Sequence, residues 1–205
     1  MKKILFLFVF CSLLFLFCGK EEEKDYFPMG LGSIWRYSGD VVLITSSSTD
    51  TLQKMVIEMK AVKKDNLTSG LEVTEFVMTD TIKSKWPMET TYVEIETTYF
   101  RESDNYILSY DSKDDPEPDT FLSLPLEKDK TWRVNSSTTA KVLNEEEVRV
   151  PAGIFKAWKI EETEDTTPTY YWLSAGTGMV KMYEEEVTSE YRVVINIELT
   201  SANIK

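Results

Sequence analysis

Carboxylates are the most abundant side chains in this sequence that could take part in chemistry. The chain has 205 residues, with 35 Asp and Glu, no His, and two cysteines, Cys11 and Cys18. The absence of histidine removes the commonest general base, the Ser-His-Asp relay and most catalytic zinc sites. Paired carboxylates could act as acid and base on a glycoside, but no pair stands out in so acidic a chain. We therefore expect no catalytic residues, no metal and no cofactor, and we interpret the protein as not an enzyme.

Two further motifs suggest ligand sites but fit loops better. The segment "DSKDDPEPD", Asp111 to Asp119, offers oxygens for calcium, but it lacks the EF-hand spacing and glycine. The pairs Gly30/Gly32 and Gly176/Gly178 suggest a phosphate loop, which requires a strand that leads into a helix. A strand-like segment follows each pair instead, so we predict turn glycines and a solvated acidic loop. Glutamate runs near 145–147, 161–165 and 184–186 are predicted to be solvated strand ends.

The N-terminal stretch has the pattern of an export signal. Lys2 and Lys3 form a basic start, and residues 4–17 are apolar except for Ser12. A membrane-spanning helix needs about 20 apolar residues, so this segment is too short to be one. It fits the apolar region of a secretory signal, which predicts a signal peptide over residues 1–17.

The residues after the signal resemble those of a bacterial lipoprotein. Cys18 and Gly19 follow the apolar segment, and the charged run "KEEEKD" comes next. The resemblance implies lipidation at Cys18 and a tether over residues 18–25. Phe17 departs from the pattern, which has a small residue before the cysteine. The alternative is a signal cut further on, but no Ala-x-Ala-like site lies between Cys18 and Pro28. We expect an exported protein of the bacterial cell envelope, anchored at the outer membrane or the outer face of the plasma membrane.

The charge balance limits the partners. The whole chain carries a formal charge of −12, and loss of residues 1–17 removes Lys2 and Lys3 but no acid, which leaves −14. An acidic surface repels phosphate backbones, so we expect no nucleic acid. The membrane contact is expected through the lipid at Cys18 and not through a basic patch.

Almost every segment after the tether alternates with a period of two. Val193, Ile195, Ile197 and Leu199 alternate with less apolar residues, as in a strand with one buried face. Similar patterns occur in segments 57–61, 71–78, 91–96 and 158–161. They predict one all-β domain over residues 26–205 with about ten or more antiparallel strands. A curled sheet or open barrel and a sandwich both remain open.

One phrase occurs twice in the chain. "FPMGLGSIWRY" (27–37) and "LPLEKDKTWRV" (124–134) share Pro, Trp and Arg at a constant offset, and "YFRESDNYIL" (99–108) parallels "YWLSAGTGMV" (171–180). We interpret these as traces of a duplicated β-meander, 26–120 and 121–205. The interpretation predicts equivalent inward positions for Trp35 and Trp132, with Arg36 and Arg133 outward; chance similarity is the alternative.

Three phrases are similar to a family of uncharacterised bacterial exported proteins and lipoproteins. They are "FPMGLGSIWRY", which fits an F-P-x-x-x-G-x-x-W-x-Y opener, "VPAGIF", which fits a V-P-A-G-x-F hairpin, and "YYWLSAGTGMVK". The resemblance covers the first strand and much of the C-terminal half, and leaves about 40–120 unmatched. It implies the fold and the envelope location, and no activity.

The function expected from these features is a non-catalytic binding or interaction module for a protein or a glycan. The alternative is a carrier or chaperone for an apolar ligand, a lipid or a lipoprotein, held in a curled β-sheet. Five tryptophans and ten tyrosines could line such a cavity or fill a core, and Trp86 beside Pro87 is the best candidate for its rim. The sequence identifies no ligand-binding residues and no particular partner.

Overall fold

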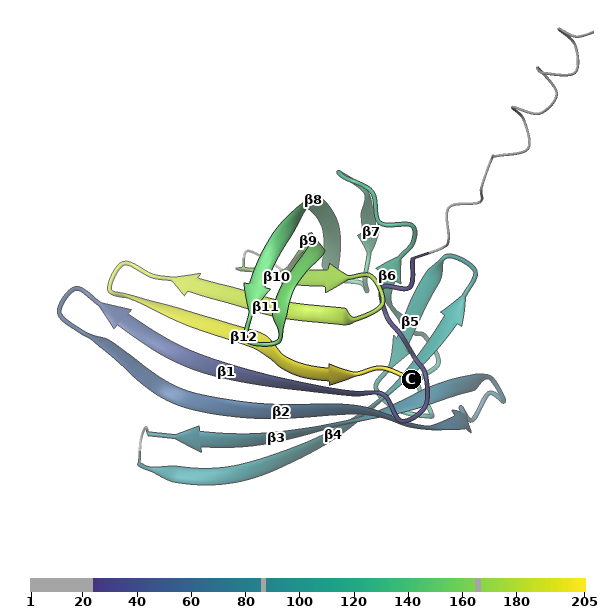
Figure 1. Ribbon diagram of the computed structural model, residues 1–205, viewed down its shortest axis with the longest axis horizontal. Coiled ribbons are helices and arrows are strands. Elements are labelled where there is room, and N and C mark those ends of the chain that lie inside the picture. Colours follow the sequence, from purple (N-terminus) through teal and green to yellow (C-terminus); the bar gives the residue numbers. More distant parts are fainter. Residues whose placement is uncertain (1–23, 86–87, 165–166) are drawn as a thin grey trace, which may run out of the picture.

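The described part of the chain folds into twelve strands that form one antiparallel sheet. The computed structural model describes residues 24–85, 88–164 and 167–205. The sheet order is β6-β5-β4-β3-β2-β1-β12-β11-β10-β9-β8-β7, and the sheet curls into a nearly closed barrel (Figure 1). The strands are β1 (Ile34–Thr45), β2 (Thr49–Asn66), β3 (Glu72–Ser84), β4 (Thr90–Ser103), β5 (Tyr106–Tyr110), β6 (Asp119–Ser123), β7 (Thr131–Arg133), β8 (Thr138–Val150), β9 (Gly153–Glu164), β10 (Thr167–Ser174), β11 (Gly178–Val187) and β12 (Tyr191–Asn203). The predicted all-β, antiparallel fold is confirmed, and the curled barrel replaces the sandwich.

The strands follow the two-residue pattern of the sequence. Ile57 and Ala61 in β2 are buried, while Lys60 between them is exposed. In β12 the same alternation buries Ile197 and Leu199. The turn between β10 and β11 needs glycine, because Gly176 and Gly178 adopt φ angles of 72° and 89°, which other residues rarely adopt. These glycines are therefore turn residues, as predicted.

The barrel is joined strongly on one side and weakly on the other. β1 pairs with β12 from Ile34↔Asn203 to Thr45↔Tyr191, so the first and last strands lie side by side in the middle of the sheet. Between the two end strands, β6 and β7, the Thr120 amide donates to the Val134 carbonyl at 2.9 Å. The Trp132 indole N–H donates to the Thr120 carbonyl at 3.0 Å. We call this junction the seam.

Aromatic rings fill the barrel near the seam. Phe27, from the segment before β1, lies 4.6 Å from Phe100 and 5.0 Å from Phe121 between ring centroids. Trp35 is 1% exposed, stacks on Phe76 at 5.9 Å and donates its indole N–H to the Thr177 carbonyl at 2.6 Å. The N-terminal segment is thus part of the core, and the first buried residues of the described chain are Tyr26 and Phe27.

A smaller cluster lies on the opposite face of β3. It contains Leu67, Val73 and Tyr110, with Tyr99 and Leu108 packed against it. The acidic loop 111–119 folds back beside this cluster: Lys113 forms an ion pair with Asp65 at 2.7 Å and lies 5.8 Å from the centre of the Tyr99 ring. The loop is therefore anchored to the sheet by a cation, although its sequence predicted only a solvated segment.

The repeated phrases occupy corresponding strands, but the two tryptophans are not equally buried. Trp35 lies in β1 and Trp132 in β7, and the second pair of phrases spans the β4–β5 and β10–β11 turns, again six strands apart. Trp35 is fully buried, whereas Trp132 is half-buried at the seam. Arg36 and Arg133 are exposed, as expected. The duplication itself stays a prediction.

Candidate functional site

One long strand of the barrel has an unpaired edge. β4 pairs with β3 from Thr90 to Phe100 but with β5 only from Tyr99 to Ser103. Along residues 90–98, no backbone hydrogen bond crosses this edge to any residue that the structure describes. Figure 1 shows this part of β4 as the lower margin of the sheet. We call residues 90–98 the β4 edge.

The β4 edge exists because the next two strands are short. β5 and β6 have five residues each, against 14 in β4. β5 ends where the acidic loop begins, and there the Asp115 carboxylate accepts hydrogen bonds from the amides of Asp111 and Ser112, both at 2.9 Å. Pro116 and Pro118 follow and lack the amide that a sheet ladder requires. The wall of the barrel therefore stops at β4 over this part of the sheet.

The β4 edge has one acidic and one apolar face. Register places Glu94 beside Asp80 and Glu96 beside Met78. Asp80 in turn pairs with the core residue Ile57, so this is the inner face of the sheet. On the outer face, Val93 is 57% exposed and Ile95 is 68% exposed. Val56 extends the outer apolar face, because it lies across β3 from Val93 in the same cross-strand row, with Thr81 between them.

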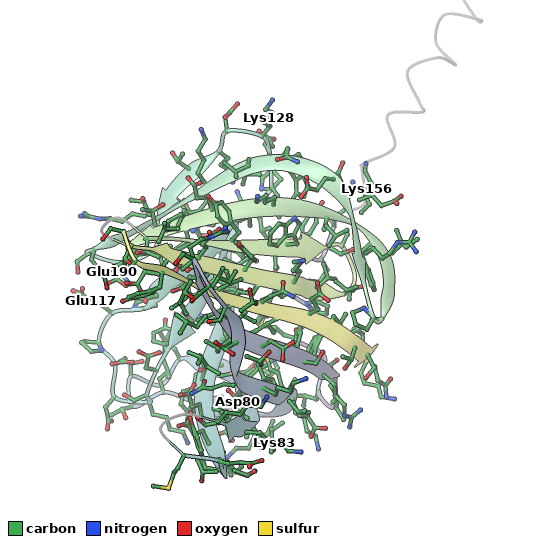
Figure 2. All side chains as sticks on the ribbon, turned by 90° about the vertical axis from the view of Figure 1, so that its left-hand side faces the viewer. Asp80, Lys83, Glu117, Lys128, Lys156 and Glu190 are labelled. Carbon is green, nitrogen blue, oxygen red and sulfur yellow. The ribbon has the colours of Figure 1, made fainter. Side chains whose placement is uncertain are left out.

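The half-buried carboxylate on the inner face, Asp80, has a raised proton affinity. The pKa of Asp80 is raised, first by its burial and then by the nearby charges of Glu96 and Glu94. One oxygen of Asp80, Oδ1, is buried and has no hydrogen-bond partner among the described residues. Lys83 lies three positions along the same strand and hence on the opposite face. Figure 2 shows Lys128 and Lys156 at the far side of the molecule from Asp80. Among the ion pairs of the described residues, none involves Asp80, Glu94 or Glu96.

A second set of inward carboxylates lies on β9 to β11. The pKa of Glu162 is raised by burial and by the charges of Asp119 and Glu164. Register connects Glu162 to Thr169 and Thr169 to Glu184, and the Thr169 hydroxyl donates to Glu184 at 3.2 Å. Within residues 24–85, 88–164 and 167–205, no group of carboxylates is arranged to hold a metal ion.

The glutamate runs are only partly solvated, which corrects the expectation from sequence. Glu147 and Glu186 are exposed, as predicted. Glu146 is exposed as well, and it accepts the Trp172 indole N–H at 2.6 Å, a bond that lowers its pKa. Glu162 faces inward. The period-two pattern would have found the inward position of Glu162 if applied to acids as well as to apolar residues, because Glu162 lies two positions after the buried Ile160.

The other candidate residues from the sequence do not form a common site in the described structure. Cys18 and Trp86 lie outside the described residues. In the acidic loop, the Asp114 carboxylate accepts the Thr68 hydroxyl, so this oxygen is used within the fold. Sequence reasoning placed a strand at 91–96 but missed Glu94, Glu96 and the unpaired edge. Only the length of the neighbouring strand reveals that edge.

Three surface clefts accompany the sheet, and none of the three lies within the aromatic core. The largest, about 520 Å³, is lined by Trp132, Arg133, Lys141 and Glu161. A cleft of about 450 Å³ lies beside Asp119 and Asn135, and one of about 350 Å³ beside Thr74 and Phe100. All three open to solvent.

Comparisons with known proteins yield two solved structures. No family model matches the chain, and no curated protein matches it. A protein of Bacteroides fragilis described as a "putative exported protein with YmcC-like fold" is 12% identical, with a TM-score of 0.49, over 88% of this chain and 99% of that one. A "putative lipoprotein" of Parabacteroides distasonis is 12% identical, with a TM-score of 0.40, over 89% and 100%. Among the described residues, no helix has the length and apolar character needed to cross a membrane.

Proposed function

We propose that this protein is a lipid-anchored, non-catalytic interaction module of the bacterial envelope that binds another protein. The anchor rests on the sequence: a signal over residues 1–17, then Cys18 and a charged tether. A chain without histidine lacks the usual proton relay, and its two sets of inward carboxylates lie on separate strands, β3–β4 and β9–β11. We therefore assign it binding and no reaction.

The observation that carries the proposal is the β4 edge. Backbone amides and carbonyls need hydrogen-bond partners, and an exposed edge is a template for a further strand. Beside it, Val93 and Ile95 are among the most exposed large apolar side chains of the described chain. The barrel near the seam is filled by Trp35 and four phenylalanines. A filled core together with an unpaired strand edge favours an interaction module over a carrier of an apolar ligand.

Crosslinking in intact cells tests the proposal without assuming which face binds. Cells that express the full chain are treated with an amine- and carboxylate-reactive crosslinker. The control is a reporter that carries residues 1–25 ahead of an unrelated folded protein. We expect a discrete protein adduct that is specific to the full chain, with crosslinks that map to the sheet. If both proteins give the same adducts, or neither gives any, the interaction module is wrong.

The carrier remains a second candidate because of the apolar side chains on the inner face beyond the core. Val41 and Ile195 are paired across β1 and β12 and are half-buried, as are Met55 and Met182 in the neighbouring row. An acyl chain could lie along such a row. Native mass spectrometry of the full chain released from lipid nanodiscs distinguishes the two functions. A non-covalent lipid at fixed stoichiometry supports the carrier, and its absence supports the interaction module.

A further inference from the structure

The β4 edge offers the backbone of an incomplete sheet. Over residues 90–98 one side of β4 is occupied by β3 and the other side is open. Nine residues of strand span about 30 Å, enough for a ladder of several hydrogen bonds. A strand added here continues the sheet in the order partner-β4-β3. Main-chain hydrogen bonds supply the affinity of such an addition, and alternate side chains supply its specificity.

The two faces of the β4 edge define which side chains an added strand needs. Its inward side chains meet Glu94 and Glu96, with the half-buried Asp80 behind them. Its outward side chains meet Val93 and Ile95. Opposite charges and aliphatic pairs across neighbouring strands are favourable, whereas like charges directly opposite are unfavourable.

We propose that the β4 edge binds an extended segment of a partner protein in which Lys or Arg alternates with aliphatic residues, added as an antiparallel strand. The cationic side chains face inward and neutralise the carboxylates of Glu94, Glu96 and Asp80, while the aliphatic ones cover Val93 and Ile95. This proposal rests on the proposed function and names the chemical class of the partner.

A second copy of the chain fits this edge poorly. Two β4 strands paired with their inner faces on the same side collect Glu94 and Glu96 from each copy, and both copies carry a net negative charge. Inward-pointing charges at an edge are a known means of preventing self-pairing. The same glutamates that repel a second copy attract a basic strand, so they select the partner.

A synthetic strand tests the inference on the full chain in phosphatidylcholine nanodiscs, whose zwitterionic surface attracts a cationic peptide weakly. The probe is a fluorescein-labelled nine-residue peptide that alternates Val and Lys. One control has the same composition with the lysines grouped together, and a second has Glu in place of Lys. Fluorescence anisotropy measures affinity, and amide hydrogen exchange locates the bound strand. We expect binding of the alternating Lys peptide about tenfold tighter than either control. Slower exchange is expected within residues 90–98.

Charge reversal then separates strand recognition from general attraction. The double variant Glu94→Lys/Glu96→Lys should lose the Lys peptide and gain the Glu peptide, a result that a misfolded protein does not give. The matched control, Glu127→Lys/Glu190→Lys, makes the same charge change at exposed positions away from the edge. It should keep the original preference. Equal binding of the grouped and alternating peptides, or protection outside 90–98, overturns the proposal. If the peptide results overturn this proposal but the crosslinked adduct in cells is still found, the protein is an interaction module that binds through another surface.

Discussion

At the scale of single residues, the fold holds carboxylates where water is scarce. Asp80 and Glu162 both face inward, and burial is the main cause of their raised pKa values. A carboxyl group whose pKa is higher in the folded than in the unfolded state binds protons more tightly when folded. Its contribution to stability is full below the unfolded pKa and is lost as the pH rises through the folded pKa. Both groups therefore oppose folding at neutral pH.

Neutral replacements of these acids should stabilise the protein only at pH values at which the carboxyl groups would be ionised. Asp80→Asn and Glu162→Gln are each expected to raise the melting midpoint at pH 7 by about 1–2 °C, a small value because both groups keep partial contact with solvent. The gain should shrink as the pH falls through the folded pKa and should be absent below the unfolded pKa of about 4. Thermal melts across this range test the sign, and Glu147→Gln, at an exposed position, is the control. A gain that grows on acidification contradicts the assignment.

Among single residues, the most buried tryptophan is expected to contribute most to the free energy of unfolding. Trp35 is 1% exposed, while Arg36 next to it points outward and pairs with Glu58 at 2.7 Å. Trp35→Ala should lower the free energy of unfolding by about 3–5 kcal/mol, since it leaves a large cavity. Arg36→Ala should change it by less than about 1 kcal/mol, because exposed ion pairs contribute little. Denaturant unfolding of both variants checks the contrast, and similar losses would show that Trp35 is not a core residue.

At the scale of elements, strand length determines where the molecule is open. β2 has 18 residues, whereas β7 has three and contacts β6 through only a few bonds at the seam. The period-two pattern of the sequence predicts that residues 91–96 form a strand, and they do. The pattern does not reveal that this strand lacks a neighbour, because the presence of a neighbour depends on where distant β5 ends. The inward position of Glu162, in contrast, does follow from the two-residue pattern, because Glu162 lies two positions after the buried Ile160.

The seam should open when its indole hydrogen bond is removed. Trp132→Phe keeps an aromatic ring but cannot donate to the Thr120 carbonyl. The Thr120 amide, bonded to Val134, should then exchange with solvent about five- to tenfold faster, as expected for the loss of about 1 kcal/mol of local stabilisation. Trp172→Phe is the control, since it removes an indole bond to Glu146 instead. Unchanged exchange at Thr120 in Trp132→Phe would show that the backbone bond alone closes the seam.

At the scale of the whole molecule, the first described residues of the chain and two long hairpins lie at opposite ends. The Gly176 amide donates to the Asp25 carbonyl at 2.6 Å, so the chain enters the barrel beside the β10–β11 turn. The tips of the β1–β2 and β11–β12 hairpins extend to the other end in Figure 1. An anchor at Cys18 would hold the β10–β11 turn near the membrane and direct these hairpins away from it.

The anchor itself is open to a direct test. Metabolic labelling with a fatty acid should mark the wild-type protein and leave Cys18→Ser unlabelled, because the thiol is the acceptor. The mature N-terminus should begin at residue 18. Label that persists in Cys18→Ser, or a mature N-terminus further along the chain, would refute lipidation at this residue.

The pairing of β1 with β12 also governs how the molecule can form. The contact Ile34↔Asn203 joins residues 169 positions apart, and it lies in the middle of the sheet. A topology with so high a contact order folds slowly, because the cost of closing a long loop precedes the gain from the contact. β1 leaves the ribosome early and must wait for nearly the whole chain before its second neighbour arrives. The wall of the barrel therefore cannot be completed before β12 has been made.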